Sequence, residues 1–224
     1  MTRGSWEGPY VQIARGLIHP GDTCIDVGAN FGYYSVLMAS MTGPGGSVWS
    51  FEPNPHVYRL LEKSLRVNGY IMNGVAKPFP VALGGAKGSA KLSFKMGDFG
   101  GGSLYSSADR VNAEGLDTVE VEVRTLDDMA LDTSRPIFMK LDAEGAEFEV
   151  LRGATKTLEK APAVTLMMEF TPAFITRHLP VGMFIDFISD LGLRIHLPKA
   201  GDLRAVGKQD LIAAGSCYVF ATRE

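Results

Sequence analysis

The sequence predicts an α/β protein with a mostly parallel sheet. Apolar runs of strand length alternate with amphipathic runs of helix length along the chain, which is the pattern of strands joined by crossover helices. The chain has 224 residues, 46% of them hydrophobic and 21% charged, which is ordinary for a globular protein. Because no linker separates two cores, we expect a single domain over residues 1–224.

Composition excludes several classes of function. The 22 Lys and Arg residues against 25 Asp and Glu residues give a net charge of −3, so we expect no nucleic-acid partner. We expect no membrane span, because no uncharged apolar run approaches the roughly 18 residues that a spanning helix needs. The start of the sequence lacks the apolar stretch of a signal peptide. Cys24 and Cys217 lie far apart in apolar runs, which favours reduced thiols and a cytoplasmic location.

The first 68 residues predict five elements, two strands and three helices. An N-terminal helical extension over 1–19 is indicated by helical spacing of apolar residues between Tyr10 and Ile18. A turn with Pro and Gly follows it. The next elements are a strand at 23–27, a helix at 33–41, a strand at 47–51 and a helix at 55–68.

The second half predicts the rest of the sheet. A strand at 79–83 precedes an edge-like alternation at 91–96. The glycine-rich stretch 97–118 is expected to be either a lid over the acceptor, with Phe99 and Tyr105 as contacts, or a surface loop. The remaining expected elements are strands at 119–123, 137–141 and 164–170, helices at 144–158 and 183–191, and an antiparallel pair at 193–197 and 216–221 that closes the C-terminal edge.

The segment 24–32 indicates a nucleoside site. It runs from a strand through a glycine turn into a helix, where glycines admit a ligand close to the backbone and free N–H groups favour an anionic group. Glu52 follows the second strand, where a carboxylate accepts both hydroxyls of a ribose. Gly28 and Gly32 do not form the G-x-G-x-x-G pattern of a pyrophosphate site. The pattern therefore favours S-adenosylmethionine, and the alternative is a tight turn in an unrelated α/β protein.

Carboxylates gather where two later strands end. Lys140 and Asp142 share one face of a buried strand, and Asp142 falls where open α/β sheets bind ligands. Glu144 and Glu147 open the next helix, and Glu169 ends the next strand. The alternatives are structural: Asp142 as a helix cap, the glutamates as complements of the helix dipole, and Lys140 as an internal ion pair.

Six blocks in order resemble the FkbM-type methyltransferases, a branch of the class I S-adenosylmethionine-dependent methyltransferases. The blocks are DVGANFG at 26–32, FEPNP at 51–55, RVNG at 66–69, KLDAEGAE at 140–147, EVLRGA at 149–154 and MEF at 168–170. The resemblance covers about residues 20–172. Gly85 departs from it, because many relatives carry an acid or amide there.

The resemblance implies a seven-stranded Rossmann-like sheet and methyl transfer from S-adenosylmethionine to a hydroxyl of a sugar or natural product. It places Asp142 and Glu144 against the acceptor, which would be a small molecule or a glycan. The implied cofactor-binding residues are Asp26, Gly28, Asn30, Gly32, Glu52, Pro53, Asn54, Val81, Ala82 and Asp142.

Methyl transfer to an alcohol needs alignment and a base or a metal. The candidate catalytic residues are therefore Asp142, Glu144, Lys140 and Glu169. A second hypothesis gives Asp142 and Glu169 to a Mg²⁺ ion, similar to catechol-type O-methyltransferases. His178 is the one histidine near these residues. The Met- and Phe-rich stretch 166–188 is a candidate homodimer interface.

Three other functions stay open at this point. One is N- or C-methylation on the same fold, although no amine-type Asn/Asp-Pro-Pro-Tyr motif is present. Another is a NAD-dependent oxidoreductase, which the missing glycine pattern disfavours. The last is a non-catalytic nucleoside-binding module, which intact carboxylates at the strand ends disfavour.

Overall fold

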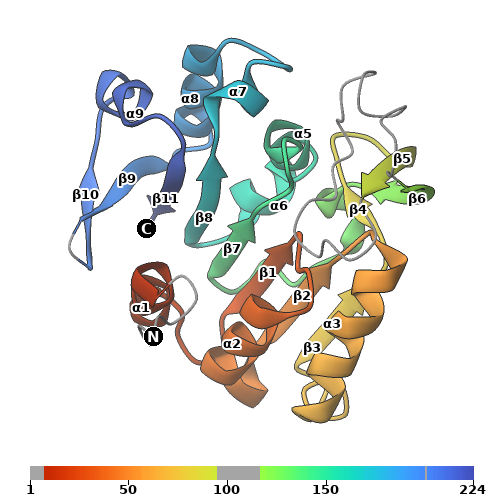
Figure 1. Ribbon diagram of the computed structural model, residues 1–224. Helices are drawn as coiled ribbons and strands as arrows, with labels where there is room; N and C mark the ends of the chain where they lie inside the picture. The colour runs from red at the N-terminus through yellow and green to blue at the C-terminus, as the bar shows by residue number, and fades with distance from the viewer. Residues whose placement is uncertain (1–7, 95–116, 200) are drawn as a thin grey trace, which may run out of the picture.

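The computed structural model describes residues 8–94, 117–199 and 201–224 (Figure 1). Among these residues, eight strands form one sheet in the order β10-β9-β11-β8-β7-β1-β2-β3. The five parallel strands are β1 (Thr23–Val27), β2 (Ser47–Phe51), β3 (Ala76–Phe79), β7 (Ile137–Leu141) and β8 (Val164–Phe170). The chain order reverses between β1 and β7, and this switch point is where open α/β sheets bind ligands.

Three antiparallel strands continue the sheet beyond β8. They are β11 (Cys217–Arg223), β9 (Arg194–Lys199) and β10 (Asp202–Ala205). The mostly parallel sheet with an antiparallel C-terminal edge is confirmed. The sheet has one strand more than the seven that the resemblance implied, because β10 folds back on β9 beyond the segment that carries the resemblance.

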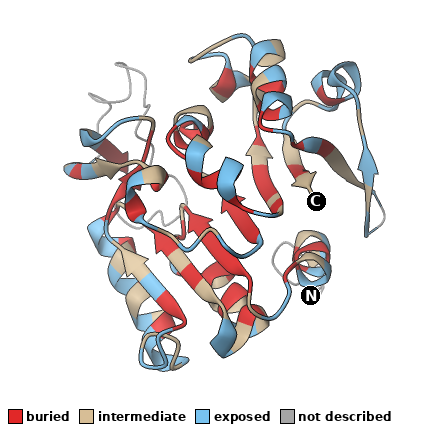
Figure 2. Cartoon of the chain, turned by 180° about the vertical axis from the view of Figure 1, so that it is seen from behind, coloured by how far each residue is buried: buried red, intermediate tan, exposed pale blue. Residues whose placement is uncertain are grey.

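Helices cover both faces of the sheet, as predicted. One face carries α1 (Gly8–Leu17), α2 (Tyr33–Thr42) and α3 (Pro55–Val67); the other carries α5 (Glu147–Arg152), α6 (Thr155–Lys160) and α8 (Val181–Asp190). Successive strand residues point to opposite faces, so Cys24 packs among the first group and Ile25 among the second. The central strands are almost wholly buried (Figure 2). Each helix among the described residues is too short or too polar to span a bilayer.

A small second sheet lies beside the main one and corrects the strand predicted at 79–83. It contains β4 (Ala82–Leu83), β5 (Gly88–Phe94) and β6 (Asp117–Arg124) in the order β4-β6-β5. The main-sheet strand ends at Phe79, and the chain crosses to the second sheet through Pro80, which has no N–H to continue a ladder. Most of the lid stretch 97–118, with Phe99 and Tyr105, lies outside the described residues.

The helix predicted at 144–158 is also divided. A turn that includes Glu144 and Gly145, both with positive φ, precedes α5, and α6 starts only after Gly153. A Cβ at Gly153 would collide with the carbonyl oxygen of Gly84, so the chain passes close to the second sheet here. The elements that the sequence did not predict are β10, the 3-10 turns η1 (Gly43–Gly45) and η2 (Leu126–Met129), and the helices α7 (Pro172–Ile175) and α9 (Lys208–Ala214).

The stretch 166–188 is mostly core rather than a surface. Met167, Met168 and Phe170 of β8 are fully buried, and so is Phe184 of α8. The large apolar side chain exposed here is Met183. The richness in Met and Phe therefore reflects packing inside the domain, which removes the reason to expect a homodimer interface in this stretch.

Candidate functional site

The glycine turn after β1 is held between two neighbouring strands. The N–H groups of Gly28 and Ala29 both donate to the carbonyl of Phe51, at 3.1 and 3.0 Å. Gly28 has φ +70°, and a Cβ there would collide with the carbonyl oxygen of Asp142 at the end of β7. Glycine is required at this position because the turn is left-handed and the two backbones touch.

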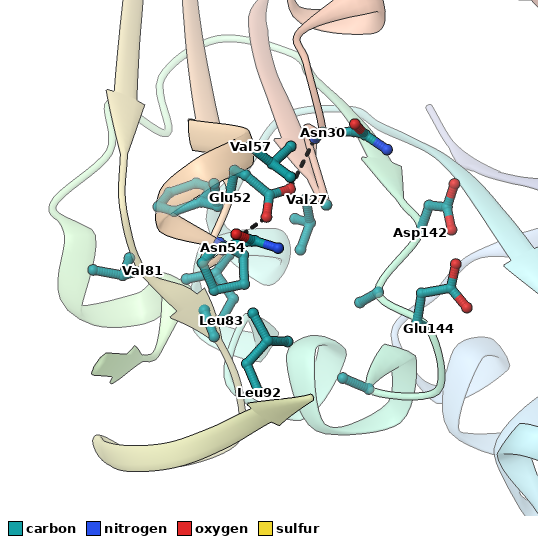
Figure 3. Close-up of a pocket in the computed structure, with 16 residues that line it drawn as sticks. Val27, Asn30, Glu52, Asn54, Val57, Val81, Leu83, Leu92, Asp142 and Glu144 are labelled. Atoms are coloured by element: carbon teal, nitrogen blue, oxygen red, sulfur yellow. Dashed lines mark hydrogen bonds between the residues drawn. The ribbon is translucent and has the colours of Figure 1, made fainter. Parts of the chain in front are cut away.

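Glu52, directly after β2, is fixed by two backbone groups. Its Oε2 accepts from Asn30 N at 2.9 Å, and its Oε1 accepts from Asn54 N at 2.8 Å (Figure 3). The side chain of Asn54 in turn caps α3 by accepting from His56 N. Burial raises the pKa of Glu52 to about 7, although both hydrogen bonds oppose the shift. Each carboxylate oxygen keeps a second lone pair, so the pair matches two vicinal hydroxyls.

A pocket opens between this carboxylate, the end of β7 and the second sheet. Val81, Leu83 and Leu92 form an apolar wall, and Asp142 and Glu144 lie at the other end with their side chains directed away from that wall (Figure 3). The lining residues that the sequence predicted are Gly28, Asn30, Glu52, Pro53, Asn54, Val81, Ala82, Asp142 and Glu144. Those it missed are Val27, Phe51, Val57, Leu83, Leu92, Ala143 and Ala146. An apolar wall opposite a carboxylate that can accept from two hydroxyls fits a nucleoside.

Asp26 and Gly32 lie outside the lining of this pocket, and their contact with the cofactor stays a prediction. Asp26 is fully buried under the turn, and its Oδ2 accepts from Ser35 Oγ at 2.6 Å. Burial raises the pKa of Asp26, and Lys140 opposes that shift. Gly32, with φ +93°, packs its backbone against Leu61 of α3. Both residues are buried on the core side of the turn and support its backbone from there.

Lys140 joins the turn to the carboxylates and likewise lies outside the pocket lining. Its Nζ lies 3.2 Å from Asp142 Oδ2 and 4.0 Å from Asp26 Oδ1, and it donates to the Gly28 carbonyl at 3.3 Å. The ammonium also lies 5.4 Å from the ring centroid of Tyr34, within cation–π range. The prediction that Lys140 and Asp142 share a face is confirmed, and burial of the lysine is offset by these partners.

Asp142 and Glu169 share one rim of the sheet, as predicted. Leu141 of β7 is in register with Met168 of β8, so the next residue on each strand lies beside the other. Burial and then Asp142 raise the pKa of Glu169, whose Oε1 accepts from Thr171 Oγ1 at 3.2 Å. Glu169 stands outside the pocket lining given above, on the β8 side of Asp142.

Glu144 lies at the rim of the pocket, whereas Glu147 has a structural role in the turn before α5. Burial and then Asp142 raise the pKa of Glu144 to about 7, and its φ of +50° is strained for a residue with a side chain. Glu147 is 3% exposed, and its Oε1 accepts from Ala143 N and Gly145 N. The carboxylate of Glu147 therefore holds the turn that presents Glu144.

Two further side chains border the rim. The Tyr218 hydroxyl on β11 donates to Asp142 Oδ2 at 2.8 Å, and no sequence pattern pointed to it. His178 is placed with its Nε2 2.8 Å from the carbonyl of Gly145, so it contacts the strained turn.

The donor set does not fit the Mg²⁺ hypothesis. Asp142 Oδ2 already contacts an ammonium, and a divalent cation bound there would face that charge at close range. In the described ranges, no group of three or more His, Cys, Asp or Glu side chains is arranged to hold a metal ion.

Comparison with known proteins places this architecture in a family. The model of the methyltransferase FkbM domain matches residues 26–195, which contain the glycine turn, Glu52 and the β7 and β8 ends. The chain belongs to the FkbM methyltransferase family. The match stops before β10, α9 and β11.

Curated methyltransferases resemble this chain at low identity. The hexuronic acid methyltransferase AglP of Haloferax volcanii is 29% identical over 143 residues, covering 62% of this chain and 52% of that protein. The methyltransferase sdnD of Sordaria araneosa is 28% identical over 155 residues, covering 58% and 59%. The chain therefore spans only about half to three-fifths of the length of these curated relatives.

Two solved structures share the fold. The FkbM methyltransferase of Methylobacillus flagellatus superposes with a TM-score of 0.52 at 17% identity, over 91% of this chain and 44% of that one. A SAM-dependent O-methyltransferase of Thermotoga maritima gives 0.50 at 14% identity, over 100% and 67%. At these identities the likeness establishes the Rossmann-like fold.

Proposed function

We propose that this FkbM-family protein binds S-adenosylmethionine and transfers its methyl group to a hydroxyl of a sugar or natural product. The observation that carries the proposal is the Glu52 carboxylate. Two backbone N–H groups orient it toward the pocket, and its remaining lone pairs suit the two hydroxyls of a ribose. The apolar wall of Val81, Leu83 and Leu92 then supports the base.

The pocket favours a nucleoside without phosphates. A pyrophosphate needs three glycines and a helix N-terminus that faces it. Here the turn carries Asn30 between its glycines, and Asp142 and Glu144 stand at the far end of the pocket. Two carboxylates would repel a phosphate chain but attract a sulfonium cation. This charge argues against a NAD-dependent oxidoreductase.

In the proposed mechanism, the bound cofactor supplies an electrophilic methyl group. The protein aligns the acceptor oxygen with it, which can lower the barrier by ~7–11 kcal/mol. Asp142 accepts the hydroxyl proton as the oxygen is alkylated, a contribution of about 10²–10⁴ in rate. Lys140 and Tyr218 engage Oδ2 of Asp142, so we assign proton acceptance to Oδ1. Glu144 and Glu169 border the acceptor side.

The charge of the rim supports a neutral acceptor atom. Asp142, Glu144 and Glu169 meet there, and the nearby cation, Lys140, is shared with Asp26. A carboxylate acceptor would be repelled. The relative named as a hexuronic acid methyltransferase supports a sugar acceptor, and we propose one of its hydroxyls as the methylated position. An amine is the second candidate, because the same carboxylates attract an ammonium group.

Two measurements test this function. Calorimetry should show binding of S-adenosylhomocysteine and none of NAD, with the affinity lost in Glu52→Ala. Methyl-labelled S-adenosylmethionine should then label glycan or polyketide alcohols in a screen with matched amines and uronic acids. Equal affinity of wild type and Glu52→Ala, or NAD binding at this pocket, would contradict the nucleoside assignment. Label on amines or carboxylates alone would contradict the hydroxyl assignment.

A further inference from the structure

We propose that Tyr218 is a positioning residue that aims Asp142 at the transferred methyl group. This inference rests on the proposed function, in which Asp142 faces that methyl. Tyr218 lies on β11, outside the segment matched by the FkbM family model. It is therefore a feature of this chain's own C-terminal segment.

Strand order explains how Tyr218 reaches Asp142. β11 is separated from β7 by β8, and strands lie roughly 4.8 Å apart, so the gap is about 10 Å. Tyr218 is in register with Glu169 of β8, and both point to the face that carries α1 to α3. A tyrosine on that face is long enough to cross β8, and its hydroxyl reaches Asp142 Oδ2 at 2.8 Å.

Two donors converge on the same carboxylate oxygen. Lys140 Nζ approaches Oδ2 of Asp142 from its own strand at 3.2 Å, and the Tyr218 hydroxyl approaches it from β11. Hydrogen bonds to a charged carboxylate are short and directional. Two of them at one oxygen fix the rotation of the group, whose third side-chain partner is Glu169, and in the proposed geometry Oδ1 faces the reacting atoms.

The phenol ring of Tyr218 is itself held in place. The ring of Tyr10 in α1 packs against it with centroids 4.9 Å apart and planes tilted by 43°. The N-terminal helix thus supports the hydrogen bond from outside the sheet. Removing the hydroxyl alone leaves this packing intact, which makes Tyr218→Phe a clean variant.

The test needs no acceptor substrate. Sinefungin carries an amine in place of the transferred methyl group, on a carbon that replaces the sulfur, so its affinity relative to S-adenosylhomocysteine reports a carboxylate aimed at the methyl position. Calorimetry would compare both ligands in wild type, Tyr218→Phe, Asp142→Asn and the double variant. Tyr70→Phe, in the turn that follows α3, is the matched control.

We expect wild type and Tyr70→Phe to prefer sinefungin. Tyr218→Phe should lose about five- to tenfold of that preference, with S-adenosylhomocysteine affinity unchanged, as expected for the net contribution of one hydrogen bond. Asp142→Asn should lose the whole preference, and the double variant should lose no more. A merely structural role would weaken both ligands equally.

The contrary outcomes separate the two proposals. If the preference depends on Asp142 but is the same in Tyr218→Phe, the inference fails and the proposed function stands. If additive losses appear in the double variant, Tyr218 does not act through Asp142 and the inference fails likewise. If wild type binds neither ligand, the proposed function fails first. If Asp142→Asn keeps the preference, Asp142 does not face the methyl and both proposals fail.

Discussion

The ammonium of Lys140 lies 3.2 Å from a carboxylate oxygen of Asp142 two residues further along the chain, at the point where β7 leaves the sheet. One cation thereby joins the fully buried Asp26, the backbone of the glycine turn and the rim of the pocket. The floor of the proposed cofactor site and its proposed acceptor side thus depend on a single side chain.

Replacing Lys140 by Met should lower the free energy of unfolding by ~3–5 kcal/mol, because it leaves buried charge without a partner. Urea unfolding would measure the loss. Adding Asp26→Asn should restore part of it, since that change removes the stranded charge. A loss in Lys140→Met below about 1 kcal/mol, the size of a surface pair, would contradict the bridging role.

Affinity for S-adenosylhomocysteine should rise with pH through about 7. Burial raises the pKa of Glu52 to about 7, and only the charged form accepts from both ribose hydroxyls. Below that pH the affinity should fall by up to about tenfold per unit. Glu52→Gln should bind weakly and without this dependence, while Glu144→Gln, which removes the other pocket carboxyl with a raised pKa, should retain it. Equal affinities of wild type at pH 5.5 and 8 would refute the role of Glu52.

The fold itself should lose stability as pH rises. The pKa of Glu147 is raised from its ordinary 4.5 to about 7, so the folded chain holds that proton more tightly than the unfolded one. Its contribution is complete below about 4.5 and is lost as pH approaches 7. The melting temperature should fall from pH 5 to 8, and less so in Glu147→Gln. An unchanged slope in that variant would contradict the assignment.

Glu144→Gly should raise stability and lower turnover. The left-handed φ of +50° costs Glu144 about 1 kcal/mol that glycine avoids. The matched variant Glu144→Ala removes the carboxylate but keeps the strain, so it should lower turnover without stabilising the fold. Thermal unfolding of both variants decides the point: equal melting temperatures would show that the turn stores no strain.

Magnesium should leave the protein unaffected. The ammonium beside Asp142 occupies the side where a cation would bind, so titration with Mg²⁺ should release no heat of binding. Turnover should be the same in a chelator. Loss of turnover in chelator, restored by Mg²⁺, would show that the lysine moves aside for a metal.

Local patterns were enough to predict the central strands and the main carboxylates. The central strands are apolar runs bounded by turn residues, so their limits can be predicted from the local sequence. They are β1, β2, β7 and β8. Because side chains alternate between the two faces of a strand, Lys140 and Asp142 were predicted to share one face. The position of Glu52 after β2 followed from the general geometry of such sheets.

The features that the sequence did not predict depend on contacts between segments that are distant in the chain. The run at 79–83 reads as one strand, yet its two halves pair with different sheets. Asp26 lies in β1 and Gly32 in the turn that follows it, and only the folded backbone shows that both are buried below that turn. Tyr218 is separated from Asp142 by 76 positions, so no spacing could have joined them.

The place of β11 between β8 and β9 bears on how the protein is made on the ribosome. β9 and β10 are synthesised before β11, yet β9 has no partner in the main sheet other than β10 until residues 217–223 have emerged. During that interval β8 presents a bare edge, open to pairing with another nascent chain. The rim that carries Asp142 and Tyr218 is thus completed only after β11 has been synthesised, and truncation within 217–223 would split the sheet rather than shorten it.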